Sequence, residues 1–548
     1  MTLHLTTFFL RTPVGRANPN AALPHPIPRT RLGSPVAANP QRRFLCIAAL
    51  LALAVAPCFA ADTKAKMLRD HEVVLDKEGR LLPWTTYDDV LKRSMNFIKR
   101  CPTVPTKFGD DPWYLVTSKF SIQGEFLRNQ NCQGSHAYWA VETLIRYYAY
   151  TGDEDAIPPV KRILDRILDF HSPADWAWPN VPATQDDSPD GEYTDEKTEP
   201  DKVCLTGVAY LKFHQFTGDD KYLKAARQIA DTIVAHTETG SETKSPLPFR
   251  VNRKTGEVMD PYTSDMLSPV LLLDELIRLG ETGQGKYRTT RDQLWKWIMD
   301  FPVKNNRWSG YYEDMVNNYN NINQQTPMET ARFMMRHPEM DPAYKTHVPA
   351  LLEFVRDRFG KSKRYGATSI KEQDICFQEM GSHTARYASI AAKWFALSGD
   401  PVWREEARAS FALVTYSFYN RFSKDQAAVN YVGVGYGPPW FTDSYFDYLC
   451  HIQDGMSELP DMAPADADHI LGSDSIIRKV KYLPGRIEYT TFEPGGNEVL
   501  RIAFKPKSIT ADGKELAADA WSCGDYHGVP GVLRLRRESG RNIVINAK

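Results

Sequence analysis

The sequence lacks the features that mark several large classes of protein. Lysine and arginine total 67 against 68 aspartates and glutamates, so there is no sustained basic patch of the kind that binds nucleic acid. It contains no Walker loop, no HExxH motif and no convincing GxSxG turn. We therefore expect no nucleic-acid partner, and none of the chemistry that those three motifs carry.

Cysteines are also few, at eight in 548 residues, and none form CxxC pairs. Their wide spacing resembles neither a zinc site nor a small disulfide scaffold. We expect no metal and no cofactor. Isolated buried thiols are the expected state for most, with one or two disulfides as the alternative in an oxidising compartment. Six cysteines follow the cleavage site predicted below: Cys101, Cys132, Cys204, Cys376, Cys450 and Cys523.

Long apolar runs are absent apart from one near the start. Arg42 and Arg43 precede the run Phe44 to Pro57, and a small-residue cleavage pattern ends at Ala60. This order is typical of a secretory signal, and the run is too short for a bilayer-spanning helix. Residues 1–60 are interpreted as leader and signal peptide, with a Pro-, Arg- and Asn-rich stretch over 1–40. The mature chain is expected to be secreted or periplasmic, with no integral membrane segment.

A helical hairpin recurs along the next 400 residues or so. In each repeat an apolar helix ends at a short turn, and an amphipathic helix begins directly after it. Gly ends the first helix and Asp or Pro opens the second, which is the usual chemistry of these positions. Five such turns occur: Thr151-Gly152-Asp153, Thr217-Gly218-Asp219, Thr282-Gly283, His337-Pro338 and Ser398-Gly399-Asp400.

Two more helical patterns flank the five hairpins, at Thr86 to Lys99 and at about 441–452, giving twelve helices in all. The flanking pair can close a ring as a sixth hairpin. The first helix of each hairpin is apolar or small nearly all round, whereas the second has a charged face. A helix without a polar face is buried. The pattern predicts an (α/α)6 toroid over residues 61–455, a mainly α fold; a helical solenoid is the rival, although its repeats are usually shorter and more even.

Strand patterns replace the helical ones near the C-terminus. Short alternating runs separated by Pro-Gly, Gly-Gly and Asp-Gly breaks begin at about Leu471. Residues 471–548 are predicted to form a small antiparallel β-sandwich-like domain. Residues 456–470 are interpreted as a linker.

The loops of the toroid differ in length, and the long ones indicate where the functional site is expected. Connections from an outer to the next inner helix take about 20 to 35 residues, whereas turns within hairpins take only a few. Long connections inside a compact domain are usually functional. All must emerge on one face, at the N-termini of the inner helices. The six connections are roughly 101–134, 172–200, 238–261, 301–323, 360–380 and 421–440.

These connections are rich in the same residue types: aromatic, acidic and amide side chains. A sugar stacks its C–H face on an aromatic ring, bonds its hydroxyls to polar groups, and needs carboxyl groups for cleavage of its glycosidic bond. The fourth connection, with Trp308, Tyr311 and Asn317, is the densest example. The expected substrate-binding residues are Trp308, Tyr311, Asn317, His136, Arg250, Tyr262, Trp178, Tyr436 and Trp440.

Hydrolysis of a glycoside needs a protonated and an ionised carboxyl group. The leading candidates are Asp314 and Glu379, followed by Asp201; helix capping is the competing interpretation for Glu379 and Asp201. Asp314 lies mid-loop, where capping does not account for it. Glu329 is expected to be a structural partner inside the barrel.

Elimination from a uronate is the alternative reaction, and it needs a base such as Tyr311 or His383. His136 and His383 occur in similar strings, Gly-Ser-His, at the starts of two inner helices. Packing within a repeat is the competing interpretation for both. Arg250 and Asn317 would neutralise the uronate carboxylate.

One string resembles the start of a calcium loop: Asp186, Ser188, Asp190 and Gly191 have suitable spacing. Lys197 stands where the bidentate acid belongs. Calcium is therefore a minor alternative to the absence of cofactors.

The hairpin rhythm, its Thr-Gly-Asp turns and the trailing β region resemble the six-hairpin glycosidase superfamily over roughly residues 85–455. That resemblance implies a carbohydrate-active enzyme, and the fold does not choose the reaction. We expect a glycoside hydrolase acting on a polysaccharide or oligosaccharide, with a polysaccharide lyase as the alternative. An exported, non-catalytic glycan-binding protein is the third reading.

Overall fold

The computed structural model describes residues 66–68, 71–100, 103–106, 109–112, 117–120, 126–130, 135–184, 196–312, 320–360, 362–375, 379–418, 440–441 and 443–547. Residues Lys64–Lys548 form one compact unit. Within the described ranges, no helix is long and apolar enough to cross a membrane.

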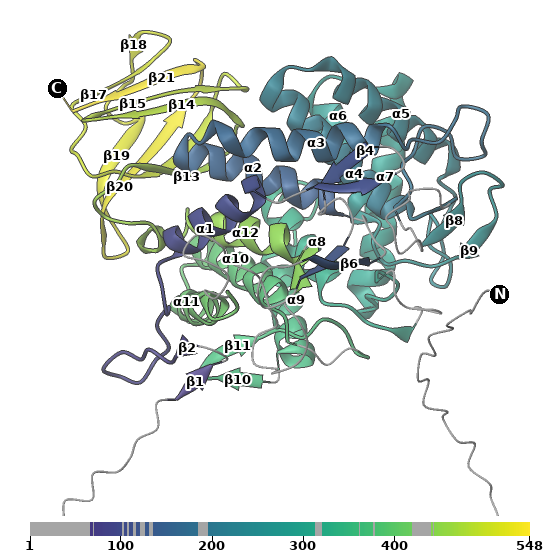
Figure 1. The fold of residues 1–548 in the computed structure, drawn as a ribbon, viewed down its shortest axis with the longest axis horizontal. Coiled ribbons are helices and arrows are strands. Elements are labelled where there is room, and N and C mark those ends of the chain that lie inside the picture. Colours follow the sequence, from purple (N-terminus) through teal and green to yellow (C-terminus); the bar gives the residue numbers. More distant parts are fainter. Residues whose placement is uncertain are drawn as a thin grey trace, which may run out of the picture. The chain divides into compact units, whose positions relative to one another are not determined.

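Twelve α-helices occur in the described ranges, and they form two rings (Figure 1). Each inner helix packs on the next, and the last packs on the first, so the inner ring closes. The inner helices are α2 (His136–Thr151), α4 (Pro200–Thr217), α6 (Leu267–Arg278), α8 (Gln325–Arg336), α10 (Gly381–Ser398) and α12 (Asp443–Gly455). The outer helices are α1 (Tyr87–Arg100), α3 (Ile157–Leu168), α5 (Asp220–His236), α7 (Lys286–Ile298), α9 (Tyr344–Phe359) and α11 (Pro401–Thr415). The predicted toroid is confirmed.

Three of the five hairpin turns have the predicted chemistry. Gly152, Gly218 and Gly399 end their helices with φ of 72°, 80° and 73°, in the left-handed region that favours glycine. Asp219 then caps α5 by accepting from the amide of Lys221 at 3.1 Å. Short helical segments lie beside the hairpins: η2 (Glu154–Ala156), η3 (Gly283–Gly285) and η4 (Met299–Val303).

The inner helices are buried on every side. In α10, every residue from Gly381 to Ala392 is buried, whereas α5 buries one stripe and exposes the other. Close approach is possible where the inner helices carry small residues. Gly207 of α4 is one such point, because a Cβ there would lie 2.8 Å from the side chain of Leu272 on α6.

The long connections are joined to one another on one side of the ring. β7 (Lys197–Thr198) of the second connection pairs with the hairpin β8 (Arg250–Asn252) and β9 (Val258–Asp260) of the third. Backbone bonds then link the third connection to the fourth and the fourth to the fifth. In the first connection, β5 (Thr117–Phe120) pairs with β6 (Phe126–Gln130), and β5 also pairs with β12 (Trp440–Phe441) of the sixth. The connections therefore share one face, as predicted.

Four short antiparallel pairings complete the toroid region or its edge. Three of them are pairs of strands: β1 (Met67–Leu68) with β2 (His71–Glu72), β3 (Thr103–Thr106) with β4 (Gly109–Pro112), and β10 (Ser362–Arg364) with β11 (Ala367–Ser369). The fourth is a single bridge between Leu75 and Leu81, outside any named strand.

The C-terminal region has two antiparallel sheets (yellow in Figure 1). One has the order β13 (His469–Ser473), β16 (Gly496–Arg501), β20 (Val529–Arg537) and β19 (Trp521–Tyr526). The other has the order β14 (Ile477–Leu483), β15 (Arg486–Thr491), β21 (Asn542–Asn546), β17 (Ser508–Ala511) and β18 (Lys514–Glu515). Alternate residues of both sheets, such as Ile487 and Leu533, enter one core.

The C-terminal sheets pack on the inner helices α2 and α4. His469 stacks on Tyr150 of α2, with ring centroids 3.9 Å apart, and its Nδ1 lies 2.8 Å from the Tyr150 carbonyl oxygen. Residues 456–468 precede β13 and include the short helix η6 (Pro460–Met462), with Met456 and Leu459 buried. This segment is therefore packed against the body of the protein.

Candidate active site

The polar residues of the candidate site lie at the N-termini of the inner helices, below the joined connections. A helix N-terminus presents unpaired N–H groups and a partial positive charge, which favours acids and anionic ligands. The described side chains at this end of the ring are Asp201 and Lys202 of α4, Asp265 before α6, Gln324 and Gln325 of α8, and His383 of α10.

Asp201 and Lys202 form a fully buried ion pair in the first turn of α4. Lys202 Nζ lies 3.0 Å from Asp201 Oδ2, and both side chains have no exposed surface. Nζ also donates to the backbone oxygen of Tyr311 at 2.5 Å and lies 3.7 Å from the centroid of the Tyr311 ring. A lysine held this way places its amino group beside one acid of the ring face.

Asp265 supplies the second buried carboxyl group, in front of the adjacent inner helix. Its oxygens accept from the amide of Ser268 at 3.1 Å and from the Ser268 hydroxyl at 2.7 Å, which caps α6. Burial raises the pKa of Asp265, although the Lys202 cation opposes that rise. Burial likewise raises the pKa of Asp201 to about 7; Lys202 opposes the rise, and the Asp265 carboxyl adds to it.

Tyr311 and Tyr312 of the fourth connection lie between the α4 and α10 sides of the ring. Their rings meet edge to face with centroids 5.1 Å apart. Tyr311 Oη accepts from Gln325 Nε2, and Tyr312 Oη accepts from Gln324 Nε2 at 2.7 Å. Burial raises the pKa of Tyr312 well above its usual value, so its phenol keeps its proton.

His383 lies on the α10 side, with Nε2 at 3.5 Å from Tyr312 Oη. Its Nδ1 lies 3.1 Å from Nη1 of Arg386, one turn further along α10. Arg386 is fully buried and binds both oxygens of Asp447 at 2.6 Å and Oε1 of Glu329 at 3.1 Å. Glu329 thus lies inside the ring as a structural partner of arginines, as the sequence analysis expected.

Further ion pairs fill the ring towards the C-terminal ends of the inner helices. Arg332 of α8 contacts Asp454 of α12, and Arg146 and Lys212 both contact Glu142 of α2. Glu142 is fully buried, and its two cations lower its pKa to about 2 against the opposing effect of burial. These charges are matched by partners, which assigns this end of the ring to stability.

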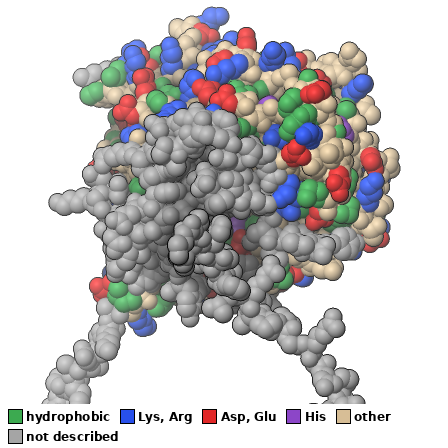
Figure 2. Space-filling view, turned by 45° about the vertical axis from the view of Figure 1, so that its right-hand side comes forward, with side chains coloured by type: hydrophobic (Ala, Val, Ile, Leu, Met, Phe, Trp, Pro, Cys, Tyr) green, Lys and Arg blue, Asp and Glu red, His purple; other side chains and the backbone are tan. Residues whose placement is uncertain are grey.

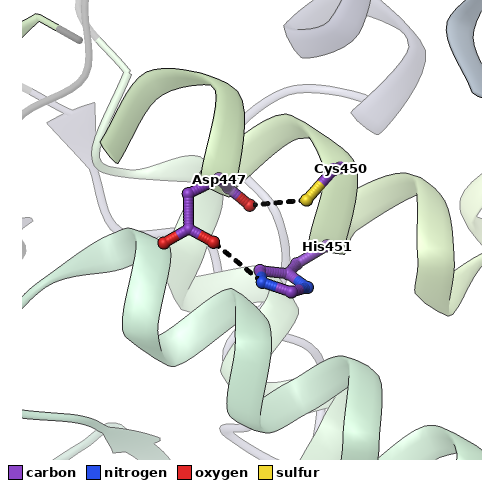
Figure 3. A group of neighbouring side chains, drawn as sticks. All are labelled: Asp447, Cys450 and His451. Carbon is purple, nitrogen blue, oxygen red and sulfur yellow. Dashed lines mark hydrogen bonds and ion pairs between the residues drawn. The ribbon is translucent and has the colours of Figure 1, made fainter. Parts of the chain in front are cut away.

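Asp447, Cys450 and His451 are close enough to suggest a metal site (Figure 3). Their i, i+3, i+4 spacing on α12 accounts for that closeness. Both Asp447 oxygens are already bound by Arg386, and burial raises the pKa of the Cys450 thiol well above its usual value. His451 Nδ1 accepts from Arg332 at 3.1 Å, which leaves the proton on Nε2. The donor set therefore does not fit a metal ion.

The sequence-predicted catalytic residues fall in different places. Asp201 and His383 lie in the cluster described above. Glu379 is buried further out, where its Oε2 accepts from Arg364 Nε of β10 at 2.8 Å. Asp314 lies outside the described residues.

The predicted binding residues also divide. Trp178 is in the core, where it stacks on His236 of outer helix α5 with centroids 4.0 Å apart. Trp308 has no exposed surface, and Tyr262 packs against Trp297 of α7. All three rings belong to the buried core, where they contribute to packing.

The remaining predicted binding residues are partly described. Arg250 of β8 binds Glu199 Oε1 at 2.7 Å at the rim of α4, and His136 is buried at the start of α2. Trp440 belongs to β12, whose backbone pairs with β5. Asn317, Tyr436 and the calcium-like string 186–191 lie outside the described residues.

The catalytic and binding candidates chosen from the sequence do not include Asp265, Lys202, Tyr312 and Arg386. Asp265 carried a usable signal, because it precedes an inner helix just as Asp201 begins one. Lys202 and Arg386 carried none, since charged residues inside an apolar helix pattern give no indication of which partner they meet.

The described surface seen in Figure 2 mixes basic and acidic side chains. On the outer wall, a cavity of about 870 Å³ lies between residues 76–87 and α11. Its Arg408 and Asp461 pair at 2.7 Å. This cavity lies apart from the buried carboxyl pair.

No protein-family model matches the sequence, and neither does any curated protein. A solved structure of a D-mannose isomerase aligns over 69% of this chain and 98% of its own, with 11% identity and a TM-score of 0.52. A cellobiose 2-epimerase from Spirochaeta thermophila DSM 6192 aligns over 69% and 98%, with 11% identity and a TM-score of 0.49. An unsaturated glucuronyl hydrolase specific for heparin aligns over 68% and 97%, with 11% identity and a TM-score of 0.44. The twelve-helix double ring of the described residues, with the likeness to the isomerase, confirms that this chain has an (α/α)6-toroid fold.

Proposed function

We propose that this protein is an exported carbohydrate-active enzyme, a glycoside hydrolase that uses Asp201 and Asp265 as its paired carboxyl groups. The observation that carries the proposal is the raised pKa of Asp201, about 7, in a site that holds a second buried carboxyl group. The fold is shared with a protein that acts on D-mannose, which supports a sugar substrate. Export rests on the signal-like segment that ends at Ala60.

The environments of the two acids suggest their roles. A general acid must be protonated at working pH, and a pKa near 7 gives Asp201 that state at neutral and mildly acidic pH. Both carboxyl groups accept two hydrogen bonds, Asp265 from the amide and hydroxyl of Ser268 and Asp201 from the amide and ammonium group of Lys202. The pKa of about 7 is what assigns Asp201 as the proton donor to the leaving oxygen, and it leaves Asp265 as the carboxylate that acts as base or nucleophile.

Of the acids first chosen from the sequence, Asp314 stays a candidate for the second carboxyl role. Glu379 is assigned to structure, because its buried carboxylate is bound by Arg364 at 2.8 Å. No metal ion or cofactor is proposed.

A polysaccharide lyase is the second candidate, favoured by one contact. Tyr312 and His383 lie 3.5 Å apart, and tyrosine and histidine are the side chains that elimination from a uronate requires. The protonated state of Tyr312 argues against it as the base. Glycan binding without turnover is the third candidate.

Product analysis tests these readings. The purified chain is incubated with neutral and uronate-containing oligosaccharides, and both new reducing ends and the ultraviolet absorbance of unsaturated uronates are followed. Hydrolysis is expected to give reducing ends without the absorbance. The absorbance would replace the hydrolase with the lyase, and binding without either product would leave a glycan-binding protein.

Matched variants assign the carboxyl groups in the same assay. Asp201→Asn and Asp265→Asn are expected to lose turnover while still binding the glycan. Asp155→Asn, at an exposed position in the toroid, is the control and is expected to keep full activity.

A further inference from the structure

We propose that Arg386 is a positioning residue that holds His383 as a neutral imidazole with its proton on Nε2, so that His383 serves a bound sugar as a hydrogen-bond donor. In this role His383 neither takes nor gives up a proton. The inference rests on the proposed function for its substrate, but its structural half stands without it.

The first step is the direction of one hydrogen bond. A guanidinium carries only donors, so Nη1 of Arg386 must donate to Nδ1 of His383 across their 3.1 Å contact. The lone pair of Nδ1 is then occupied. A neutral imidazole bonded in this way carries its proton on Nε2.

The second step is the charge of the ring. His383 is 5% exposed, and burial followed by the Arg386 cation lowers its pKa well below the usual value. Arg386 itself is held charged by Asp447 of α12 and Glu329 of α8. A second proton on His383 would place two cations in contact.

The third step is where the Nε2 proton points. Nε2 lies 3.5 Å from Tyr312 Oη, at the outer limit for a hydrogen bond. That oxygen already accepts from Gln324 at 2.7 Å and donates to the Glu372 carbonyl at 3.1 Å. The His383 N–H is therefore only weakly held and can donate to a sugar oxygen placed beside Tyr312.

An arginine donates to Nδ1 of a second buried histidine inside the ring, and this pair can be compared with Arg386 and His383. Arg332 donates to Nδ1 of His451 at 3.1 Å, and Nε2 of His451 lies 2.8 Å from Asp447 Oδ1. His451 thus has the same proton arrangement, but its N–H faces a structural carboxylate.

The proton position is measured directly by NMR of the full chain labelled with ¹⁵N-histidine, with His383 assigned through the signals lost in His383→Gln. At neutral pH, His383 is expected to show an unprotonated Nδ1 and a protonated Nε2. An Nδ1–H tautomer or an imidazolium would overturn the proposal. Arg386→Met is expected to release His383 into a mixture of tautomers, and an unchanged single tautomer in that folded variant would remove Arg386 from the account.

Activity separates a donor from a base and does not depend on Arg386→Met folding. Glutamine places an N–H near the position of Nε2, so His383→Gln is expected to keep kcat within about tenfold. His383→Leu, which has no donor, is expected to lose about 100-fold or more. Equal, large losses in both variants would contradict the donor role.

The two proposals can fail separately. If no glycan is cleaved, the hydrolase proposal fails, while the NMR result still decides the proton position of His383. If glycans are cleaved and His383→Gln loses as much activity as His383→Leu, the donor role of His383 is wrong while the hydrolase proposal stands.

Discussion

Asp201 and Lys202 are neighbours in sequence and form an ion pair with no exposed surface, 3.0 Å apart. Taking two charges out of water is costly, and the cost is recovered only with good geometry and further hydrogen bonds. Lys202 finds these in the backbone oxygen and ring of Tyr311. The pair thus links the acid of the proposed reaction to the fourth connection.

Removal of the cation should change the pH range in which Asp201 works. A general acid is active when protonated, so activity is lost as pH rises through its pKa. Lys202 lowers that pKa, and Lys202→Met should therefore move the alkaline limb of kcat/KM upward by about 1–3 pH units. The exposed Lys296→Met is the control. If the alkaline limb of kcat/KM stays at the same pH in Lys202→Met, Lys202 does not influence the group whose titration sets that limb.

A glycine at the junction of two connections should be sensitive to substitution. Gly310 has φ of +71°, and a Cβ there would collide with the carbonyl oxygen of Tyr262. Gly310→Ala is expected to lower the free energy of unfolding by about 2–5 kcal/mol, measured by urea denaturation.

The control for that substitution is Gly79→Ala, with φ of +79° and open space around the Cβ. It should cost only the left-handed strain of about 1–2 kcal/mol. Equal losses at the two positions would mean that the contact between connections adds nothing.

The docking of the C-terminal sheets on α2 should weaken in acid. Burial lowers the pKa of His469, so the folded protein keeps this ring neutral while the unfolded chain binds a proton below about pH 6.5. Its contribution is fully present above that pH and is lost as pH falls, by at most about 2 kcal/mol at pH 5.

His469→Asn keeps an N–H donor for the Tyr150 carbonyl and removes the titration. Its free energy of unfolding should fall less between pH 7 and pH 5 than that of the native chain. The same change at exposed His527 is the control. If the free energy of unfolding falls equally with pH in the native chain and in His469→Asn, protonation of His469 does not cause the loss of stability in acid.

The fold was readable because its signals are local. Each hairpin carries a helix-ending glycine and a capping acid within three residues, as at Gly218 and Asp219, and burial all round shows in helix composition.

Less of the candidate site could be predicted from the sequence, because its residues contact partners on other elements of the fold. Glu379 looked like a catalytic acid, and its partner Arg364 lies on another strand of the same connection. Asp265 caps α6, and its effect on Asp201 arises only when α4 and α6 lie side by side. Sequence order does not report either distance.

The most direct test of the central claim is the pH dependence of kcat/KM for the native chain and for Asp201→Asn on a cleaved glycan. The account predicts that native activity falls as pH rises through about 7. In Asp201→Asn, kcat/KM should be lower by about 100-fold or more, and it should not fall as pH rises through that range. An Asp201→Asn protein that keeps native activity, or keeps the same alkaline limb, would contradict the assignment of Asp201 as the general acid.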